Sequence, residues 1–322
     1  MSSSRRKEYE VASKNLLIIG TGALATLFAA RLSAIGINIT LLGTWREALE
    51  VFTQQGAQVD GTAAYPVRAT NYPAECGRAR LALVLVKSWQ TERAVGQLAA
   101  CLAPDGLAVS LQNGLGNDSV LARTLGRPRV GVGVTTLGAS LVAPGIVRVA
   151  GDGPLWLERR PRIDPLAVML REAGFAVEVV DDIRPRVWGK LVVNAAINPL
   201  TALLRVKNGD LLTDPQARGL MHRLAREAAA VAEAHGVALP FQGPERAAEE
   251  VAERTRENLS SMLRDVLRGA PTEVDAINGE VVRRGETYQL AVQVNRLVWE
   301  LMKKQSRLSS AELSDMVRLG QS

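Results

Sequence analysis

The sequence predicts an α/β fold in which an N-terminal Rossmann-type dinucleotide-binding domain precedes an all-α C-terminal domain. Short apolar segments alternate with helical patterns up to about residue 182, which is typical of a parallel sheet with helical crossovers. Helical patterns separated by Pro and Gly follow, and a glycine-containing turn begins at Gly20, directly after the first apolar segment. We place the domains at residues 15–182 and 183–322, after a Ser-rich, charged flexible extension over residues 1–14.

The first domain contains the strands of the predicted sheet. The continuous apolar segment 81–86 is suited to a central strand, because strands of parallel sheets are buried on both faces. The predicted strands are 16–19, 37–42, 81–86, 107–111, 130–134, 145–149, 155–158 and 177–180, and the predicted helices include 23–34, 89–102 and 165–173.

The second domain is almost entirely helical. Asp214 before Pro215 predicts a helix start, and the same helix is expected to end at His235-Gly236. Pro199 should end the preceding helix, because the residue before a proline rarely adopts helical geometry. An amphipathic helix is predicted over 245–268, and Thr272 with Asp275 resembles a capping box.

Composition restricts the possible partners. The net charge is +6, but basic residues alternate with acidic ones along the helices and aromatic residues make up 4%, so no nucleic-acid surface is expected. No apolar run reaches the roughly 20 residues that a membrane helix needs, and no secretory signal is evident, so we expect a cytoplasmic protein without a membrane partner. Cys76 and Cys101 are too few for a disulfide framework and, like His222 and His235, lack metal-ligand spacing.

The turn after the first strand carries the signature of a dinucleotide site. Gly20-x-Gly22-x-x-Ala25 follows a strand and opens a helix, so that helix N-terminal amides face an anion. Gly20 permits the tight turn, Gly22 lets the backbone approach a pyrophosphate, and Ala25 allows close packing of helix on strand. The alternative is a small-residue turn required only for packing. The predicted cofactor-binding residues of the turn are Gly20, Thr21, Gly22, Ala23, Leu24 and Ala25.

The ends of later strands supply further cofactor candidates. The second strand is followed by Thr44 and Arg46 and no carboxylate until Glu47, which favours NADP because a hydroxyl and a guanidinium suit a 2′-phosphate. Lys87 and Asn113 follow two other strands, at the edge where open α/β sheets bind ligands. Each has an ordinary alternative: a solvated arginine, a solvated lysine or an Asn-Gly turn.

A polar stripe on the helix after residue 184 supplies candidate catalytic groups. Lys190, Asn194 and Asn198 recur every four residues among apolar neighbours, and buried polar groups need partners. A desolvated lysine can donate a proton to a carbonyl oxygen, since burial lowers its pKa. The alternative is a polar face in contact with solvent. Ser260-Ser261 inside a helix and Glu273 in a helix's first turn would be unremarkable alone.

These segments resemble the ketopantoate reductase (2-dehydropantoate 2-reductase) family, from about Leu16 to beyond Arg284. Two positions depart from the family pattern: Ala25 replaces the third glycine, and Thr44 stands where some members carry a phosphate-binding arginine. The resemblance rests on Gly20 to Ala25, Val86 to Gln90, Gln112 to Gly114, Trp188 to Lys190 with Asn194, Asn198 to Leu200, Asn208-Gly209, Ser260 to Met262 with Asp265, and Thr272 to Gly279.

The resemblance implies NADPH-dependent reduction of 2-dehydropantoate to pantoate, a step toward pantothenate and coenzyme A, at a site between the domains. It implies that Lys190 is the proton donor and that Glu273 contacts the cofactor and orders the site. It further implies substrate contacts from Lys190, Asn194, Asn198, Asn208 and Ser261, and cofactor contacts from Lys87, Asn113 and Ala139.

Two other functions fit the sequence. One is a related reductase of a different 2-oxo acid; the other is a dinucleotide-binding sensor without catalysis, which would not need Lys190, the asparagine stripe and Glu273 together. The apolar face over Leu290 to Leu301 fits either a core helix or a homodimer interface. No metal is required by any of these functions.

Overall fold

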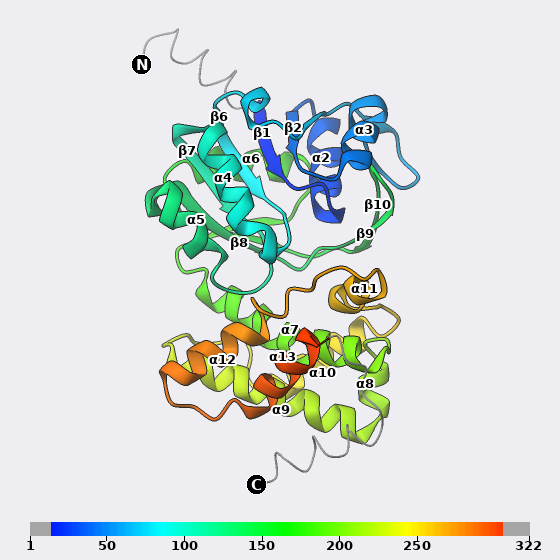
Figure 1. The fold of residues 1–322 in the computed structure, drawn as a ribbon, viewed down its shortest axis with the longest axis vertical. Helices are drawn as coiled ribbons and strands as arrows, with labels where there is room; N and C mark the ends of the chain where they lie inside the picture. Colours follow the sequence, from blue (N-terminus) through cyan, green and yellow to red (C-terminus); the bar gives the residue numbers. More distant parts are fainter. Residues whose placement is uncertain (1–13, 305–322) are drawn as a thin grey trace. The chain divides into compact units, whose positions relative to one another are not determined.

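The computed structural model describes residues 14–304, which form two compact units (Figure 1). One unit holds residues 14–112 and 117–183, and the other holds 113–116 and 184–304. The first is built on a mainly parallel sheet and the second is helical, so the predicted fold class is confirmed. The predicted N-terminal extension lies outside the described residues apart from Lys14, as do residues 305–322.

The main sheet has eight strands in the order β12-β11-β8-β7-β6-β1-β2-β5. Neighbouring strands pair in parallel except β8 and β11, an antiparallel pair that the alternating pattern did not predict. The strands are β1 (Asn15–Ile19), β2 (Asn38–Leu42), β5 (Arg68–Thr70), β6 (Ala79–Val84), β7 (Leu102–Ser110), β8 (Val130–Thr135), β11 (Leu155–Glu158) and β12 (Val177–Val180).

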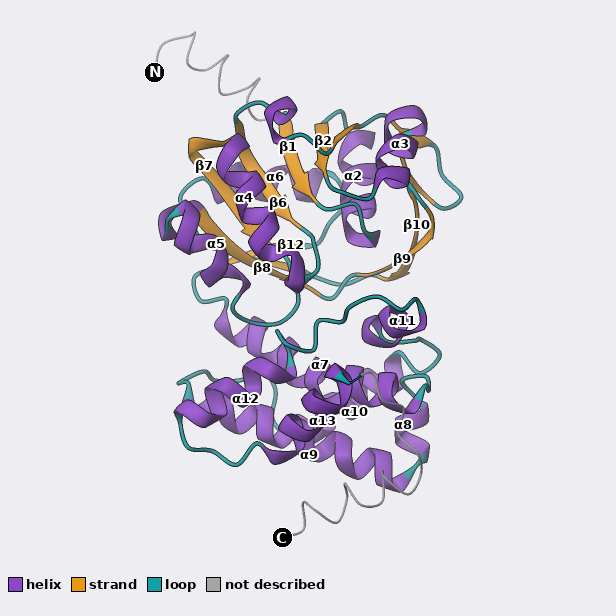
Figure 2. Ribbon diagram, in the orientation of Figure 1, coloured by secondary structure: helices purple, strands orange, loops and turns teal. Residues whose placement is uncertain are grey.

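Helices cover both faces of this sheet (Figure 2). Successive side chains of a strand point to opposite faces, so Leu16 and Ile18 of β1 pack in one cluster and Leu17 and Ile19 in the other. The first cluster includes α2 (Ala23–Ala34), α3 (Arg46–Gln55) and α6 (Ile163–Glu172). The second includes α4 (Thr91–Cys101) and α5 (Asn117–Leu125). Burial on both faces explains why these strands read as continuous apolar runs.

A smaller sheet of four strands, in the order β4-β3-β10-β9, packs against α2. Its strands are β3 (Ala57–Val59), β4 (Ala64–Tyr65), β9 (Gly138–Ala143) and β10 (Ile146–Gly151). Only β10 corresponds to a predicted strand, because β3 and β4 have three and two residues and leave little periodic signal.

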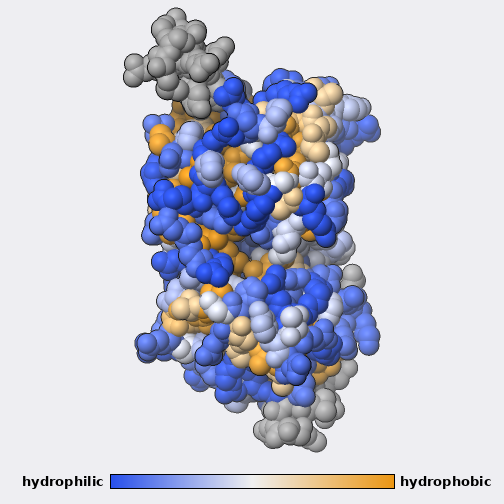
Figure 3. Space-filling view, turned by 90° about the vertical axis from the view of Figure 1, so that its left-hand side faces the viewer, coloured by the Kyte–Doolittle hydropathy of each residue, from blue (hydrophilic) through white to orange (hydrophobic). Residues whose placement is uncertain are grey.

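The helical unit is organised around the long helix α7, which is buried along most of its length. The start of α9 follows the prediction: the Asp214 carboxylate accepts hydrogen bonds from the N–H groups of Gln216 and Ala217 at 2.8 and 3.3 Å. On the molecular surface that Figure 3 shows, hydrophilic residues predominate in both units. The helices are α7 (Arg184–Leu204), α8 (Asp210–Thr213), α9 (Pro215–Ala234), α10 (Pro244–Arg254), α11 (Ser261–Leu267), α12 (Asn278–Thr287) and α13 (Gln293–Lys303).

Two predicted features in residues 245–275 are wrong. The segment 245–268 is not one helix, because α10 ends at Arg254 and Ser260 caps a new helix by accepting from the Leu263 N–H at 3.0 Å. The capping box at Thr272 is also absent. Residues 274–277 form turns and α12 begins only at Asn278, so Glu273 precedes that helix by one turn.

Pro199 does not end α7, contrary to the prediction, because another side chain replaces the hydrogen bond that proline cannot make. Proline has no N–H, so the Ala195 carbonyl four residues earlier loses its helical donor. The Asn278 Nδ2 group donates to that carbonyl at 3.0 Å. The helix therefore continues to Leu204.

Asn278 belongs to a buried polar chain that links four helices. Its Nδ2 group also donates to Asn295 Oδ1 at 3.0 Å, and Asn295 Nδ2 donates to Glu227 Oε2 at 2.8 Å. Glu227, on α9, accepts the N–H groups of Val294 and Asn295, which lie in the unsatisfied first turn of α13. Both asparagines are fully buried. This chain holds α7, α12, α13 and α9 in one arrangement.

The apolar character of α7 and α13 follows from packing within the helical unit. By length and composition alone, α7 is apolar enough to cross a membrane, although polar residues interrupt its apolar sequence. Most of it is buried among the other helices, as in the core helix of a globular unit. The apolar face of α13 similarly places Val294, Val298 and Met302 in this core.

Asn278→Ala should destabilise the helical unit by about 2–4 kcal/mol, because it removes donors from two buried acceptors. The cost should be smaller, about 1–2 kcal/mol, in a Pro199→Ala background, where the new N–H of residue 199 can donate to the Ala195 carbonyl. Urea unfolding of the four proteins, followed by tryptophan fluorescence, measures both costs. Equal costs in the two backgrounds would contradict this account of Pro199.

Candidate active site

The turn after β1 combines a glycine required by the fold with one that the fold does not require. Gly20 has φ +127°, and a Cβ there would lie 3.1 Å from the Leu85 backbone. Gly22 has an ordinary φ of −82°, and a Cβ would meet no atom within 4 Å. Open space above a backbone at the start of a helix is the cradle that a pyrophosphate fills, so the turn fits a dinucleotide.

The carboxyl ends of neighbouring strands surround this turn. Thr44 and Arg46 are exposed after β2, with Arg46 the first residue of α3. Lys87 is half-buried three residues after β6 and begins a short 3₁₀ turn (Ser88–Gln90). Ala139 lies in β9, half-buried against the cluster that contains α2.

Gln112 fixes the ends of two adjacent strands. Its Nε2 group donates to the Val86 carbonyl at 3.1 Å and to Thr91 Oγ1 at 2.8 Å, while its Oε1 accepts from Ser110 Oγ at 2.9 Å. The side chain thus joins the ends of β6 and β7.

Residues 113–116 belong to the helical unit, although the residues on either side of them in the sequence belong to the first unit. The sequence does not predict this assignment. The Leu115 N–H donates to the Ala276 carbonyl at 2.9 Å. Gly114, with φ +84°, lies so close to that carbonyl that a Cβ would be 2.3 Å from its oxygen. Asn113 Nδ2 donates to Glu273 Oε2 at 3.1 Å. The Asn113-Gly114 pair is therefore a turn, and it also brings an amide to the Glu273 carboxylate.

Lys190 lies on α7 and is half-buried. It is one helical turn from Asn194, which is half-buried, and two from Asn198, which is buried. Burial lowers the pKa of Lys190 to about 8, and the nearby Glu273 carboxylate opposes this change by favouring the ammonium. A lysine with this pKa exchanges protons near neutral pH.

The two remaining predicted substrate contacts have different surroundings. Asn208 is buried and donates through Nδ2 to Thr255 Oγ1 at 2.8 Å, while its Oδ1 atom has no hydrogen-bond partner among the described residues. Ser261 is exposed at the start of α11, not inside a helix. Its neighbour Ser260 is buried and accepts from Thr201 Oγ1 at 2.7 Å, which ties α11 to the end of α7.

Sequence reasoning missed several residues around these positions. Asn278 and Ser260 support α7, but their partners lie more than 50 residues away and leave no local pattern. Trp45 and Tyr72 follow the ends of the adjacent strands β2 and β5, with 38% and 61% of their surface exposed. Large exposed aromatic residues at the ligand-binding edge of a sheet are a signal that could have been read once the strands were assigned.

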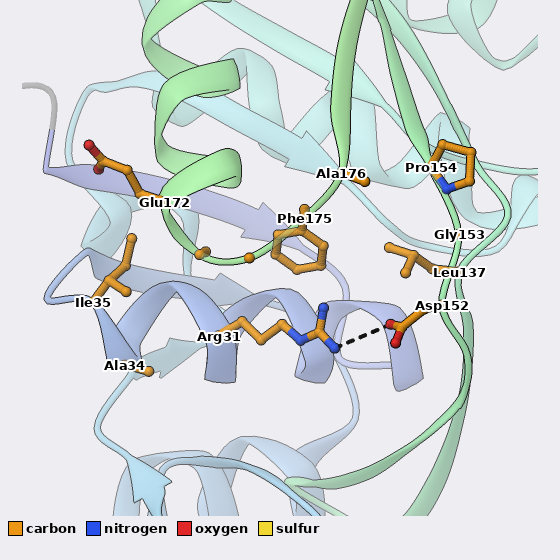
Figure 4. Close-up of a pocket in the computed structure, with 12 residues that line it drawn as sticks. Arg31, Ala34, Ile35, Leu137, Asp152, Gly153, Pro154, Glu172, Phe175 and Ala176 are labelled. Carbon is orange, nitrogen blue, oxygen red and sulfur yellow. Dashed lines mark ion pairs between the residues drawn. The ribbon is translucent and has the colours of Figure 1, made fainter.

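A separate cavity of about 710 Å³ lies in the first unit, at the end of α2 (Figure 4). Arg31 lies 3.5 Å from Asp152 there and its guanidinium is 5.1 Å from the centre of the Phe175 ring. None of the predicted site residues lines this cavity.

Comparison with known proteins gives the family. The model of the ketopantoate reductase PanE/ApbA family matches residues 16–162, and the model of its C-terminal domain matches residues 182–306. The 2-dehydropantoate 2-reductase of Archaeoglobus fulgidus is 38% identical over 295 residues, which cover 89% of this chain and 96% of that protein. The chain belongs to the ketopantoate reductase family.

Solved structures agree with this assignment. The PanE/ApbA family ketopantoate reductase from Ralstonia eutropha JMP134 superposes with a TM-score of 0.85 at 30% identity, covering 90% of this chain and 98% of that one. D-Mandelate dehydrogenase, solved with NADH and anilino(oxo)acetate, gives a TM-score of 0.83 over 94% of this chain and 99% of its own. At 23% identity, the second likeness shows the fold alone.

Gly22→Ala should leave the stability unchanged within about 0.5 kcal/mol but weaken dinucleotide binding at least about tenfold, because its methyl group occupies open space above the turn. Gly20→Ala should instead destabilise the fold, since its φ is +127°. Thermal unfolding and fluorescence titration with NADPH and NADH separate the two effects. Unaltered affinity in the Gly22 variant would exclude close approach of a pyrophosphate to this turn.

Glu273→Gln should lower the pKa of Lys190 further, because the carboxylate that stabilises the ammonium is lost. If Lys190 donates a proton, kcat/KM falls as pH rises through its pKa, so the inflection should move to lower pH in the variant. A pH–rate profile of both proteins tests this expectation. An inflection at the same pH in both proteins would show that Glu273 does not act on the titrating group.

Proposed function

We propose that this protein reduces 2-dehydropantoate to pantoate with NADPH. The observation that carries the proposal is the Lys190 ammonium on α7, with a pKa of about 8 and the Glu273 carboxylate nearby, in a chain of the ketopantoate reductase family. The curated relative from Archaeoglobus fulgidus bears the name of this reaction and is similar over nearly its whole length. The product would serve pantothenate and coenzyme A formation.

In this proposal, Lys190 controls the developing charge on the substrate oxygen. When bound, NADPH would supply the hydride for the carbonyl carbon. Lys190 hydrogen-bonds the carbonyl oxygen and transfers a proton to it as negative charge forms, so no free alkoxide is produced. Asn194 and Asn198 extend the same stripe of α7 and offer donors and acceptors for the carboxylate and hydroxyl groups. Asn208, whose buried Oδ1 atom has no hydrogen-bond partner among the described residues, would accept a hydrogen bond from a substrate hydroxyl.

The proposed preference for NADP rests on the end of β2. Thr44 and Arg46 are both exposed there, and a guanidinium with a hydroxyl matches a 2′-phosphate. The exposed rings of Trp45 and Tyr72 would supply apolar surface for the adenine. Lys87 and Asn113 would contact the rest of the cofactor.

Steady-state assays of NADPH and NADH oxidation with 2-dehydropantoate and with a panel of other 2-oxo acids test this function. The expected result is the highest kcat/KM for 2-dehydropantoate with NADPH. A higher value for another 2-oxo acid would support the related-reductase alternative. Binding of NADPH without its oxidation by any 2-oxo acid would support a sensor and overturn the proposal.

Lys190→Met should lower kcat by on the order of 10²–10⁴-fold, the usual cost of losing a general acid. Lys207→Met is the matched control, because Lys207 is exposed and its ammonium pairs with Glu257 at 2.7 Å. Rates are measured at saturating substrate, after unfolding midpoints have shown that both variants fold. Near-normal turnover in the Lys190 variant would remove this residue from the proton-donor role.

Arg46→Ala should raise the KM for NADPH by about tenfold while changing the KM for NADH by less than about twofold, because only NADPH carries the 2′-phosphate. Arg93→Ala, at an exposed position of α4, serves as the control. Parallel titrations with both cofactors give the four constants. An equal effect on NADPH and NADH would show that Arg46 does not recognise the phosphate.

A further inference from the structure

The two cysteines of the chain lie next to each other although 25 positions separate them. Cys76 is the last residue of the 3₁₀ turn η1 (Pro73–Cys76), and Cys101 is the last residue of α4. These two elements pack together, and Cys76 contacts the buried cluster that contains Cys101. Each thiol donates to a carbonyl near its own place in the chain, Cys76 Sγ to Tyr72 at 3.8 Å and Cys101 Sγ to Gln97 at 3.3 Å, and the two thiols are near enough for each to change the pKa of the other. Their sequence spacing gave no sign of this proximity.

The two thiols have different surroundings. Cys76 is half-buried, whereas Cys101 is completely buried. The neighbouring Cys101 thiol lowers the pKa of Cys76, and the Arg68 guanidinium acts in the same direction, while burial and the Glu75 carboxylate oppose them. The pKa of Cys101 is raised by the Cys76 thiol and by burial. Cys76 is thus the more accessible thiol and the first to ionise, and Cys101 keeps its proton.

We propose that Cys76 and Cys101 form a peroxide-oxidisable thiol pair that closes to a reversible intramolecular disulfide. The Cys76 thiolate attacks one oxygen of a hydroperoxide; the O–O bond breaks, a Cys76 sulfenic acid forms, and hydroxide or alkoxide leaves with the electron pair. The Cys101 sulfur then attacks the sulfenic sulfur, the S–O bond breaks, and the Cys101 proton leaves with the departing oxygen as water. The two sulfurs are oxidised by two electrons in total, and the hydroperoxide is reduced.

The pairing gives Cys76 a route back to the thiol. A sulfenic acid without a neighbouring thiol proceeds to sulfinic acid, which ordinary reductants do not reverse. Closure onto Cys101 stores the oxidised state as a disulfide instead, and a dithiol reductant restores both thiols while becoming a disulfide itself. The turn that bears Cys76 is anchored to the sheet, since Thr70 Oγ1 donates to Glu75 Oε2 at 2.5 Å. The thiol is therefore held in place beside its partner.

The test uses the reduced full-length protein and stoichiometric hydrogen peroxide. Intact mass should fall by about 2 Da, a non-reducing peptide map should link the Cys76 and Cys101 peptides, and dithiothreitol should reverse both changes. In Cys101→Ala, the sulfenic acid should persist and be trapped by dimedone on Cys76. In Cys76→Ala, Cys101 should react at least about tenfold more slowly, because it is buried and protonated.

Circular dichroism and unfolding midpoints establish that both variants fold. Alanine is chosen over serine because it adds no hydroxyl group at buried position 101. Oxidation of the unmodified protein to sulfinic acid on Cys76, with Cys101 remaining a thiol, would overturn the proposal. So would a disulfide only between two copies of the chain, or no reaction at either thiol. None of these measurements depends on reductase activity, so the thiol pair and the proposed function can fail separately.

Discussion

The hydrogen bond from Asn278 to the Ala195 carbonyl allows the site-bearing helix to continue where its sequence would break it. Without that donor, Pro199 leaves an unpaired carbonyl in a buried helix, a cost of about 1–3 kcal/mol that favours ending the helix earlier. With it, Lys190, Asn194 and Asn198 remain on one continuous helix and share one stripe. The hydrogen bonds that link Asn278 to Asn295 and Asn295 to Glu227 hold the Asn278 side chain in place. A buried polar network therefore determines the geometry of the proposed substrate-binding face.

The electrostatics of Lys190 depend on a balance between burial and one carboxylate. Burial disfavours the ammonium, and Glu273 recovers part of that loss, which leaves the pKa at about 8. Asn113 Nδ2 donates to the same carboxylate at 3.1 Å, so the amide helps to hold in place the group that favours the Lys190 ammonium. Asn113 thus has a role toward Lys190 that is separate from any cofactor contact.

The sequence was most informative where neighbouring residues alone determine the local structure. Seven of the eight strands of the main sheet were predicted from their apolar residues, as was the helix start at Asp214-Pro215. The eighth, β5, has only three residues, of which Arg68 and Thr70 are polar, and it was not predicted. Lys190, Asn194 and Asn198 were identified as candidates from their spacing alone, and their place on one helix follows that spacing. Errors occurred at Pro199, Ser260 and Thr272, where a distant partner or a broken helix overrides local preference. The roles of Glu273 and Asn208 came from family resemblance, because a single acid or amide has no pattern to read.

The loop over residues 112–116 makes contacts that could not be predicted from the Gln112-Asn113-Gly114 motif, because most of the residues it contacts lie far away in the sequence. Gln112 was recognised only as part of a motif, yet it joins two strand ends through three hydrogen bonds. Gly114 must be glycine because of the Ala276 carbonyl, which lies more than 160 residues away in the chain. Since Gln112 and Asn113 are covalently linked, the residue that fixes the strand ends is adjacent to the residue that contacts Glu273. The motif therefore combines two structural tasks, because Gln112 holds the ends of β6 and β7 together while Asn113 and Gly114 make contacts within the helical unit.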